Sequence, residues 1–104
     1  MIDQENILTT IKTLVKEEIP DAKVYLFGSR ATGKVHEESD WDVLILTSGE
    51  VNRSLKHQIH DKLFPLSVEI SSFINSIVVN DKEWLENPSY YVLRHSINDE
   101  VISL

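Results

Sequence analysis

The chain has 104 residues, of which 41% are hydrophobic, and its 10 Lys and Arg against 17 Asp and Glu give a formal net charge of −7 at pH 7. This length supports one small domain with a buried core but not two, so we expect residues 1–104 to form a single domain. The negative charge excludes a broad, sequence-independent grip on nucleic acid. The absence of cysteine excludes disulfides and thiolate chemistry. With neither a signal peptide nor an apolar span in the sequence, we expect a cytoplasmic protein that does not enter membranes.

Three elements are predicted in the first half of the chain. Apolar residues at helical spacing predict an amphipathic helix over residues 4–18, which Pro20 closes. Residues 23–27 (KVYLF) are rich in β-formers and end at a glycine, which indicates a strand that runs into a turn. Residues 40–46 (DWDVLIL) begin polar and finish continuously apolar, as expected of a strand whose far end is buried on both faces.

The second half continues the alternation of helices and strands. Apolar residues spaced four apart between Gly49 and Pro65 predict a second amphipathic helix. Residues 66–73 (LSVEISSF) alternate between apolar and polar and predict a third strand. Residues 81–86 and 88–98 are predicted to be helical on either side of a proline, and we expect the apolar tail VISL to pack back on the domain.

Strands separated by helices, with a helix before the first strand, indicate an α+β (mixed α/β) fold rather than a bundle or a sandwich. We expect a short mixed sheet of three to four strands flanked by helices. The edges of so narrow a sheet need cover, and the C-terminal residues or a partner chain, including a second copy of this chain, are the candidates to provide it.

The residues after the first predicted strand favour a polyphosphate site. Gly28 lets the backbone turn sharply and approach a ligand closely. Exposed N–H groups and the Ser29 hydroxyl would contact phosphate oxygens, and Arg30 would neutralise them with its fork of donors. In the competing interpretation, Arg30 forms only a surface salt bridge with Glu37 or Glu38.

The same segment also meets the spacing of a P-loop, because residues 28–34 read GSRATGK. However, Val35 stands where a Ser or Thr must hold magnesium. A chain this short also lacks the length for the larger parallel sheet of such domains, so we set the P-loop interpretation aside.

Three carboxylates are the candidate catalytic and metal-binding residues. Asp40 and Asp42 lie two apart at the start of a strand, which places both on one face about 6.5 Å apart. Two carboxylates so close repel each other unless a cation compensates them, and Mg²⁺ suits such a pair together with substrate phosphates. Glu69 occupies a polar position inside the third predicted strand, where the same metal would stabilise it. Three carboxylates suit in-line nucleotidyl transfer with two metal ions. In the competing interpretation, the aspartates are solvent-exposed residues at the start of a strand whose later residues are buried, and Glu69 is an ordinary exposed residue.

Two further groups of residues permit a functional interpretation and a structural one. His57 and His60 lie three residues apart on the second predicted helix. They either bind zinc as a pair or are solvated side chains, since no further ligands lie nearby in the sequence. Three aromatic residues lie near the C-terminal end: Trp84, Tyr90 and Tyr91. They would either form a surface for base stacking or for a partner, or pack the C-terminal helix against the sheet.

The motifs Gly28-Ser29-Arg30-Ala31 and Ser39-Asp40-Trp41-Asp42 together resemble the polymerase β-like nucleotidyltransferase superfamily, and within it the minimal nucleotidyltransferase (MNT-type) domains. The order of helices and strands is similar over most of the chain. The resemblance implies Mg²⁺-dependent transfer of a nucleoside monophosphate, usually AMP from ATP, to a hydroxyl of a protein or small molecule. It also implies that the third carboxylate, more often Asp in this family, falls on Glu69.

The resemblance further implies a small helical HEPN-type partner, because some minimal nucleotidyltransferases act as antitoxins that adenylylate a tyrosine on such a protein. The alternative is a catalytically weak or inactive binding module of the same fold that covers a helical partner. A third interpretation, modification of an aminoglycoside-type small molecule, usually requires an extra substrate domain.

Overall fold

The computed structural model describes residues 3–32, 40–97 and 101–104 of the chain. Its elements are, in order, α1 (Gln4–Glu18), β1 (Lys23–Phe27), α2 (Ser29–Thr32), β2 (Trp41–Thr47), α3 (Arg53–Glu69), β3 (Ile74–Asn80), α4 (Asp81–Glu86), the 3-10 turn η1 (Pro88–Tyr90), α5 (Tyr91–Ile97) and β4 (Ile102–Ser103). The strands form one sheet in the order β3-β2-β1-β4, in which β1 is antiparallel to β2 and β4, and β2 is parallel to β3. The predicted mixed α+β fold is therefore confirmed.

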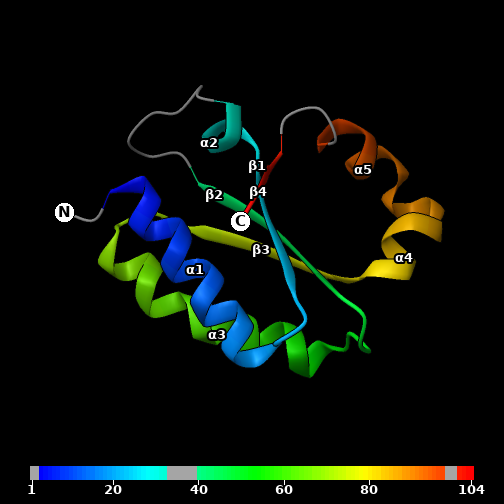
Figure 1. The fold of residues 1–104 in the computed structure, drawn as a ribbon, viewed down its shortest axis with the longest axis horizontal. Helices are drawn as coiled ribbons and strands as arrows, with labels where there is room; N and C mark the ends of the chain where they lie inside the picture. The colour runs from blue at the N-terminus through cyan, green and yellow to red at the C-terminus, as the bar shows by residue number, and fades with distance from the viewer. Residues whose placement is uncertain (1–2, 33–39, 98–100) are drawn as a thin grey trace.

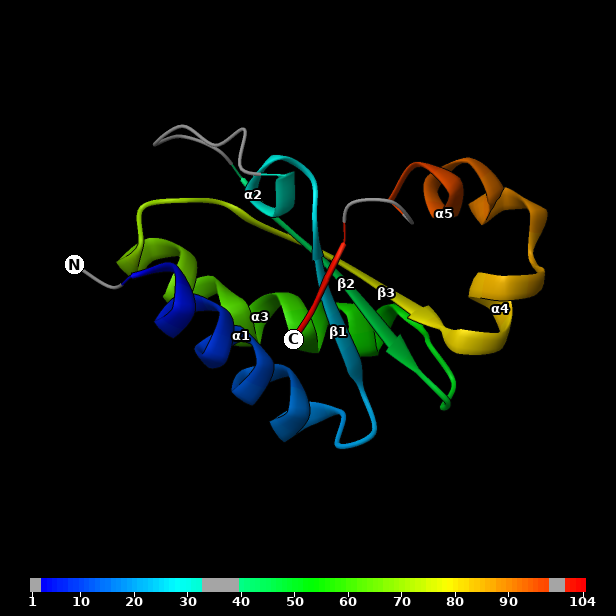
Figure 2. The same ribbon diagram turned by 45° about the horizontal axis from the view of Figure 1, so that its top comes forward.

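Helices α1 and α3 lie side by side against one face of the sheet, whereas α4 and α5 lie beyond the end of β3 and lean over the opposite face (Figures 1 and 2). Most of the core lies between the sheet and the first helix pair. There α1 buries Ile7, Ile11 and Val15, and the odd-numbered positions of β2 point into the same cluster, because side chains alternate along a strand. A second, smaller cluster joins Leu44 to Trp84 and Ile97 on the opposite face.

The first two elements agree with the sequence. Helix α1 spans the predicted residues, and its N-cap Asp3 accepts a hydrogen bond of 2.9 Å from the backbone N–H of Asn6, which satisfies one of the free donors at the helix start. Strand β1 also has the predicted bounds. Strand β2 begins and ends one residue later than predicted, so that Asp40 lies just before it.

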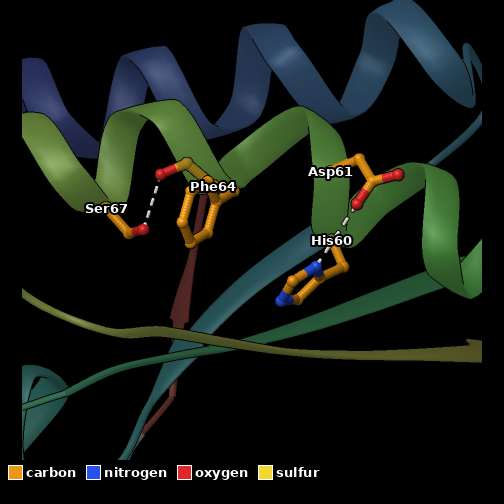
Figure 3. A network of polar contacts seen from close by, with 4 residues as sticks. All are labelled: His60, Asp61, Phe64 and Ser67. Atoms are coloured by element: carbon orange, nitrogen blue, oxygen red, sulfur yellow. Dashed lines mark hydrogen bonds and ion pairs between the residues drawn. The ribbon is translucent and has the colours of Figure 1, made fainter.

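The predicted strand over residues 66–73 is wrong. Helix α3 continues through Pro65 to Glu69, even though a proline inside a helix removes a backbone donor and typically costs about 3 kcal/mol. Leu63 and Leu66, on either side of the proline, are both buried in the core, and that burial offsets the cost. Figure 3 shows the outer surface of this part of α3, where the Ser67 hydroxyl donates to the Phe64 carbonyl at 2.6 Å.

The turn that follows α3 explains where the third strand begins. Ser71 adopts a left-handed conformation with φ of 54°, and its N–H donates to the Val68 carbonyl. A residue in this conformation commonly ends a helix. The chain then reaches β3 at Ile74, eight residues later than the predicted strand start.

The C-terminal elements follow the prediction closely. Helix α4 has the predicted bounds, and η1 and α5 together account for residues 88–97. The tail forms β4, in which Ser103 pairs with Tyr25 and Ile102 pairs with Leu26. The N–H of Leu104 also donates to the Val24 carbonyl at 2.8 Å. The C-terminal residues, one of the two candidates that the sequence offered, thus cover one edge of the sheet, that of β1.

Candidate functional site

The turn after β1 brings the two sequence motifs together. Gly28 has φ of +76°, a conformation that side chains other than glycine rarely adopt. The antiparallel register sets Phe27 opposite Asp42, so that the next residue reaches the Asp42 carboxylate. A Cβ atom at position 28 would overlap that carboxylate. Position 28 therefore needs glycine both for its backbone conformation and for the space that Asp42 occupies.

Asp40 and Asp42 lie on the sheet face opposite α1 and α3. Trp41 and Val43 point into the core on the helix side, and the alternation of the strand directs Asp42 to the other face. Asp42 is half-buried and Asp40 is exposed. Burial raises the pKa of Asp42 above its ordinary value; a hydrogen bond from Asn75 opposes the rise, and the charge of Asp40 adds to it. The two aspartates are thus close enough to repel each other when both are ionised.

Asn75 is a site residue that the sequence interpretation missed. The parallel register sets it directly beside Asp42, and its amide Nδ2 donates to Asp42 Oδ1 at 3.3 Å. One step earlier, the N–H of Trp41 donates to the Phe73 carbonyl at 2.9 Å, which places Phe73 beside Asp40. The two positions that flank the aspartates on the neighbouring strand thus carry an amide and a phenyl ring. Correct placement of β3 would have identified both.

Glu69 does not occupy the predicted position. It is the exposed last residue of α3 rather than part of a strand beside the aspartates. Within residues 3–32, 40–97 and 101–104, no three His, Asp or Glu side chains come together in a group that could hold a metal ion. The structure therefore brings together two of the three predicted carboxylates, Asp40 and Asp42.

Arg30 lies at the rim of the same site. Its guanidinium carbon is 4.2 Å from the ring centroid of Trp41, a stacking geometry that is favourable for a cation on an aromatic face. Burial lowers the pKa of Arg30, and the negative charge of Asp40 opposes that shift. The backbone of Ser29 begins α2, whereas the Ser29 side chain, Glu37 and Glu38 lie outside the described part of the structure. Arg30 is thus held near Asp40 by its stacking on Trp41, a contact that the sequence did not suggest.

A hollow of about 550 Å³ lies on the sheet face that carries Asp42. Tyr25 and Leu44 form its floor, and Leu44 is the next residue after Asp42 on that face of β2. The remaining lining residues come from the sheet, from α4 and α5, and from the tail; they are Lys23, Leu46, Asp81, Lys82, Trp84, Leu85, Ile97 and Val101. Because these segments are distant in sequence, the sequence alone does not reveal this hollow.

The structure favours packing over ligand binding for Trp84 and Tyr90. Trp84 is buried, and its ring lies 5.8 Å from that of Tyr90. Tyr91 is exposed instead and stacks on His95. On α3, His60 Nδ1 lies 3.5 Å from Asp61 Oδ1, and both side chains are largely exposed (Figure 3). The described residues thus give no support to the zinc interpretation of His57 and His60.

Comparisons with known proteins identify a matching family model and similar folds. A family model described as "Nucleotidyltransferase domain" matches residues 8–92. A toxin–antitoxin crystal structure with AMP-PNP gives a TM-score of 0.68 at 21% identity, over 91% of this chain and 69% of that one. Spectinomycin adenyltransferase AAD(9) from Enterococcus faecialis, with ATP and spectinomycin, gives 0.67 at 19% identity, over 81% of this chain and 37% of that one.

A third structure, of a tri-AMPylated Shewanella oneidensis HEPN toxin in complex with an MNT antitoxin, gives a TM-score of 0.63 at 19% identity, over 97% of this chain and 71% of that one. At these identities the likeness establishes the fold alone. A comparison with curated protein sequences gives no match. None of the described helices is long and apolar enough to cross a membrane. Because the family model covers most of the chain, including both motifs and the sheet that joins them, the chain belongs to the nucleotidyltransferase domain family.

Proposed function

We propose that this chain binds Mg²⁺ and ATP at Asp40 and Asp42 and transfers AMP to a hydroxyl group. The observation that carries this proposal is the close approach of Gly28 to the Asp42 carboxylate, with the charge of Asp40 acting on both Asp42 and Arg30. This approach joins a turn that suits phosphate to a pair of carboxylates that suits a hard cation. ATP as the donor is supported by relatives of the same fold that were crystallised with ATP or AMP-PNP.

The side chains at the site fit a magnesium ion. Two carboxylates on one face, with partial burial of Asp42 and mutual repulsion, form a donor set that a divalent cation would stabilise. Asp40 and Asp42 would hold the ion, which when bound would supply charge neutralisation for the triphosphate. Arg30 adds a fixed positive charge near Asp40, and the left-handed turn at Gly28 brings the backbone close to the Asp42 carboxylate.

The proposed reaction is an in-line displacement at the α-phosphorus of ATP. The acceptor oxygen forms a new bond to that phosphorus, and the bond from the phosphorus to the oxygen that bridges to the β-phosphate breaks. Pyrophosphate leaves, and the acceptor proton passes to water. The chain's own contribution is to position the reactants and to neutralise charge, as is general for phosphoryl and nucleotidyl transfer. The hollow beyond Leu44 offers an apolar place for a ring of the donor or acceptor.

A HEPN-type helical protein is the acceptor and partner that we propose. Structures of toxin–antitoxin pairs with the same fold support this choice. Two groups of exposed apolar side chains offer contact surfaces: Phe64, Val68 and Phe73 next to α3, and Leu85, Tyr91 and Val92 on α4 and α5. A small-molecule acceptor has less support, because this chain spans only 37% of the spectinomycin enzyme.

The second candidate function is a binding module with weak or no transfer activity. It is favoured by a specific observation, namely that Asn75 and Phe73 stand where a third carboxylate would lie beside the aspartates. In this case the chain still covers a helical partner, and loss of Asp42 leaves the complex intact.

Transfer of label from ATP tests the proposal. The chain is incubated with its copurified partner, Mg²⁺ and ATP labelled at the α-phosphate. We expect the partner to be labelled, and Asp42→Asn to reduce the labelling rate at least about 100-fold, because a direct metal ligand matters more than its supporting residues. Asp61→Asn is the matched control, because it removes the same charge from an exposed position on α3. Undiminished labelling with Asp42→Asn excludes the enzyme, whereas an intact but unlabelled complex supports the binding module.

A further inference from the structure

We infer that this site binds one divalent cation rather than two, and that Asn75 is the residue that limits it to one. The inference rests on the proposed function, because it concerns the metal that Asp40 and Asp42 would hold. It departs from the two-metal arrangement that the three predicted carboxylates suggested.

The position of Asn75 follows from the parallel pairing of β2 and β3. Strand β3 is the only described neighbour of β2 on this side, and residues paired in register share a face of the sheet. Asn75 therefore projects beside Asp42, with 3.3 Å between its Nδ2 and Asp42 Oδ1. Because β1 occupies the other side of β2, a third ligand from the sheet next to Asp42 would come from position 75 or from position 73 beside Asp40.

Neither residue replaces a carboxylate. The Asn75 amide points its NH₂ group at Asp42, and an NH₂ group donates hydrogen bonds but does not bind cations. If the amide were turned over, it would offer one neutral oxygen and no charge. Phe73 offers no donor at all, and its side chain is 56% exposed. In the described residues, no other acidic side chain completes a metal-binding group with this pair, and Glu69 is the exposed last residue of α3.

The charge at the site leads to the same conclusion. Two carboxylates contribute two negative charges, and the guanidinium of Arg30 is close enough to Asp40 for their charges to interact. The described side chains therefore place at most two negative charges next to the metal. Two divalent ions held 3.5–4 Å apart, the usual spacing of two-metal sites, would repel each other strongly without a third carboxylate to bridge or compensate them. One ion matches the available charge.

Metal counting tests the inference without any activity measurement. Purified chain is titrated with Mn²⁺ alone, and free Mn²⁺ is measured by electron paramagnetic resonance. We expect one bound ion per wild-type chain. Asn75→Asp, at an exposed position, is expected to bind a second ion or to bind the first at least tenfold more tightly. Phe73→Asp provides a second three-carboxylate variant next to Asp40. Glu69→Gln serves as the control and is expected to leave binding unchanged.

Each outcome has a defined meaning. Two ions bound to the wild-type chain overturn the inference while leaving the proposed function intact. Unchanged stoichiometry and affinity in both Asn75→Asp and Phe73→Asp, with native circular dichroism, also overturn it. If the wild-type chain binds no Mn²⁺ and Mg-ATP does not shift its melting temperature, the proposed function itself fails. One ion in the wild type together with a gain in either variant supports the inference.

Discussion

At the scale of single residues, the ionised carboxylate of Asp42 destabilises the folded protein. Burial and the charge of Asp40 both raise its pKa, and the amide of Asn75 only partly offsets this effect. A carboxyl group whose pKa is higher in the folded state binds its proton more readily when folded. The folded protein therefore loses stability as the pH rises from the ordinary carboxyl value of 3.8 through the raised one.

This loss of stability with rising pH leads to a prediction for Asp42→Asn in metal-free protein. We expect the variant to melt a few degrees above the wild type at pH 7, because it removes the ionised carboxylate. The gain should vanish below about pH 4, where the wild-type residue is protonated in both the folded and the unfolded state. Melting curves in the presence of EDTA between pH 4 and pH 8 provide the measurement. Asp61→Asn, which makes the same change in net charge, should show no such gain; an equal gain in both variants would attribute the effect to net charge alone.

Gly28 gives a second prediction at this scale. Gly28→Ala should reduce the free energy of unfolding by about 1–2 kcal/mol, because a left-handed backbone is unfavourable for alanine and the new Cβ displaces Asp42. Urea unfolding measures the loss, and Mn²⁺ binding should weaken in parallel. Gly49→Ala is the matched control, because the nearest atom to a Cβ there is Thr47 Oγ1 at 3.7 Å. A similar loss in both variants would contradict the role assigned to Gly28.

The site could be predicted from the sequence only where its residues are near one another along the chain. Gly28, Asp40 and Asp42 follow from local rules: a glycine after a strand, and two carboxylates two residues apart. Asn75 does not, because its place depends on which residue of β3 pairs with Asp42. An error in the start of that strand moved the third site position to Glu69. The stacking of Arg30 on Trp41 is likewise a tertiary contact that no local pattern encodes.

At the scale of elements, α3 shows how tertiary packing overrides a local signal. Pro65 and the alternation of residues 66–73 favoured the end of a helix and the start of a strand. The same residues also place Leu63, Leu66 and Ile70 at helical spacing, with the two leucines buried and Ile70 packed against the core. Burial of that stripe against α1 and the sheet decides in favour of the helix, and it is visible only once α1 and α3 are seen side by side (Figure 2).

The proline in α3 is therefore a stability cost that can be removed. Pro65→Ala restores a backbone N–H that can donate to the Asp61 carbonyl and removes the clash of the ring with the preceding turn. Because proline also restricts the unfolded chain, which favours the wild type by about 0.4–1 kcal/mol, we expect a net gain of about 2 kcal/mol in the free energy of unfolding. Urea denaturation provides the test. A loss of stability would mean that the bend at Pro65 is needed to seat Leu66.

At the scale of the whole molecule, the net charge of −7 opposes compaction. Among the described residues, Lys62 lies 2.8 Å from Glu17 and 3.6 Å from Glu18, and such surface pairs contribute about 0–1 kcal/mol. We therefore expect the melting temperature to rise by a few degrees when NaCl is raised from about 20 mM to about 500 mM, because screening relieves the repulsion. A fall in melting temperature over this range would show that the ion pairs contribute more than the repulsion.

Because β4 pairs with β1, the edge of β1 is covered only after the C-terminal residues have been synthesised. Residues 23–27 leave the ribosome about 75 residues before residue 102, which at roughly 5–20 residues per second is a delay of about 4–15 s. Throughout that time, the outer edge of β1 has no strand to cover it and is open to pairing with another nascent chain. The first aggregates to form in an overexpressing cell are therefore expected to contain β1.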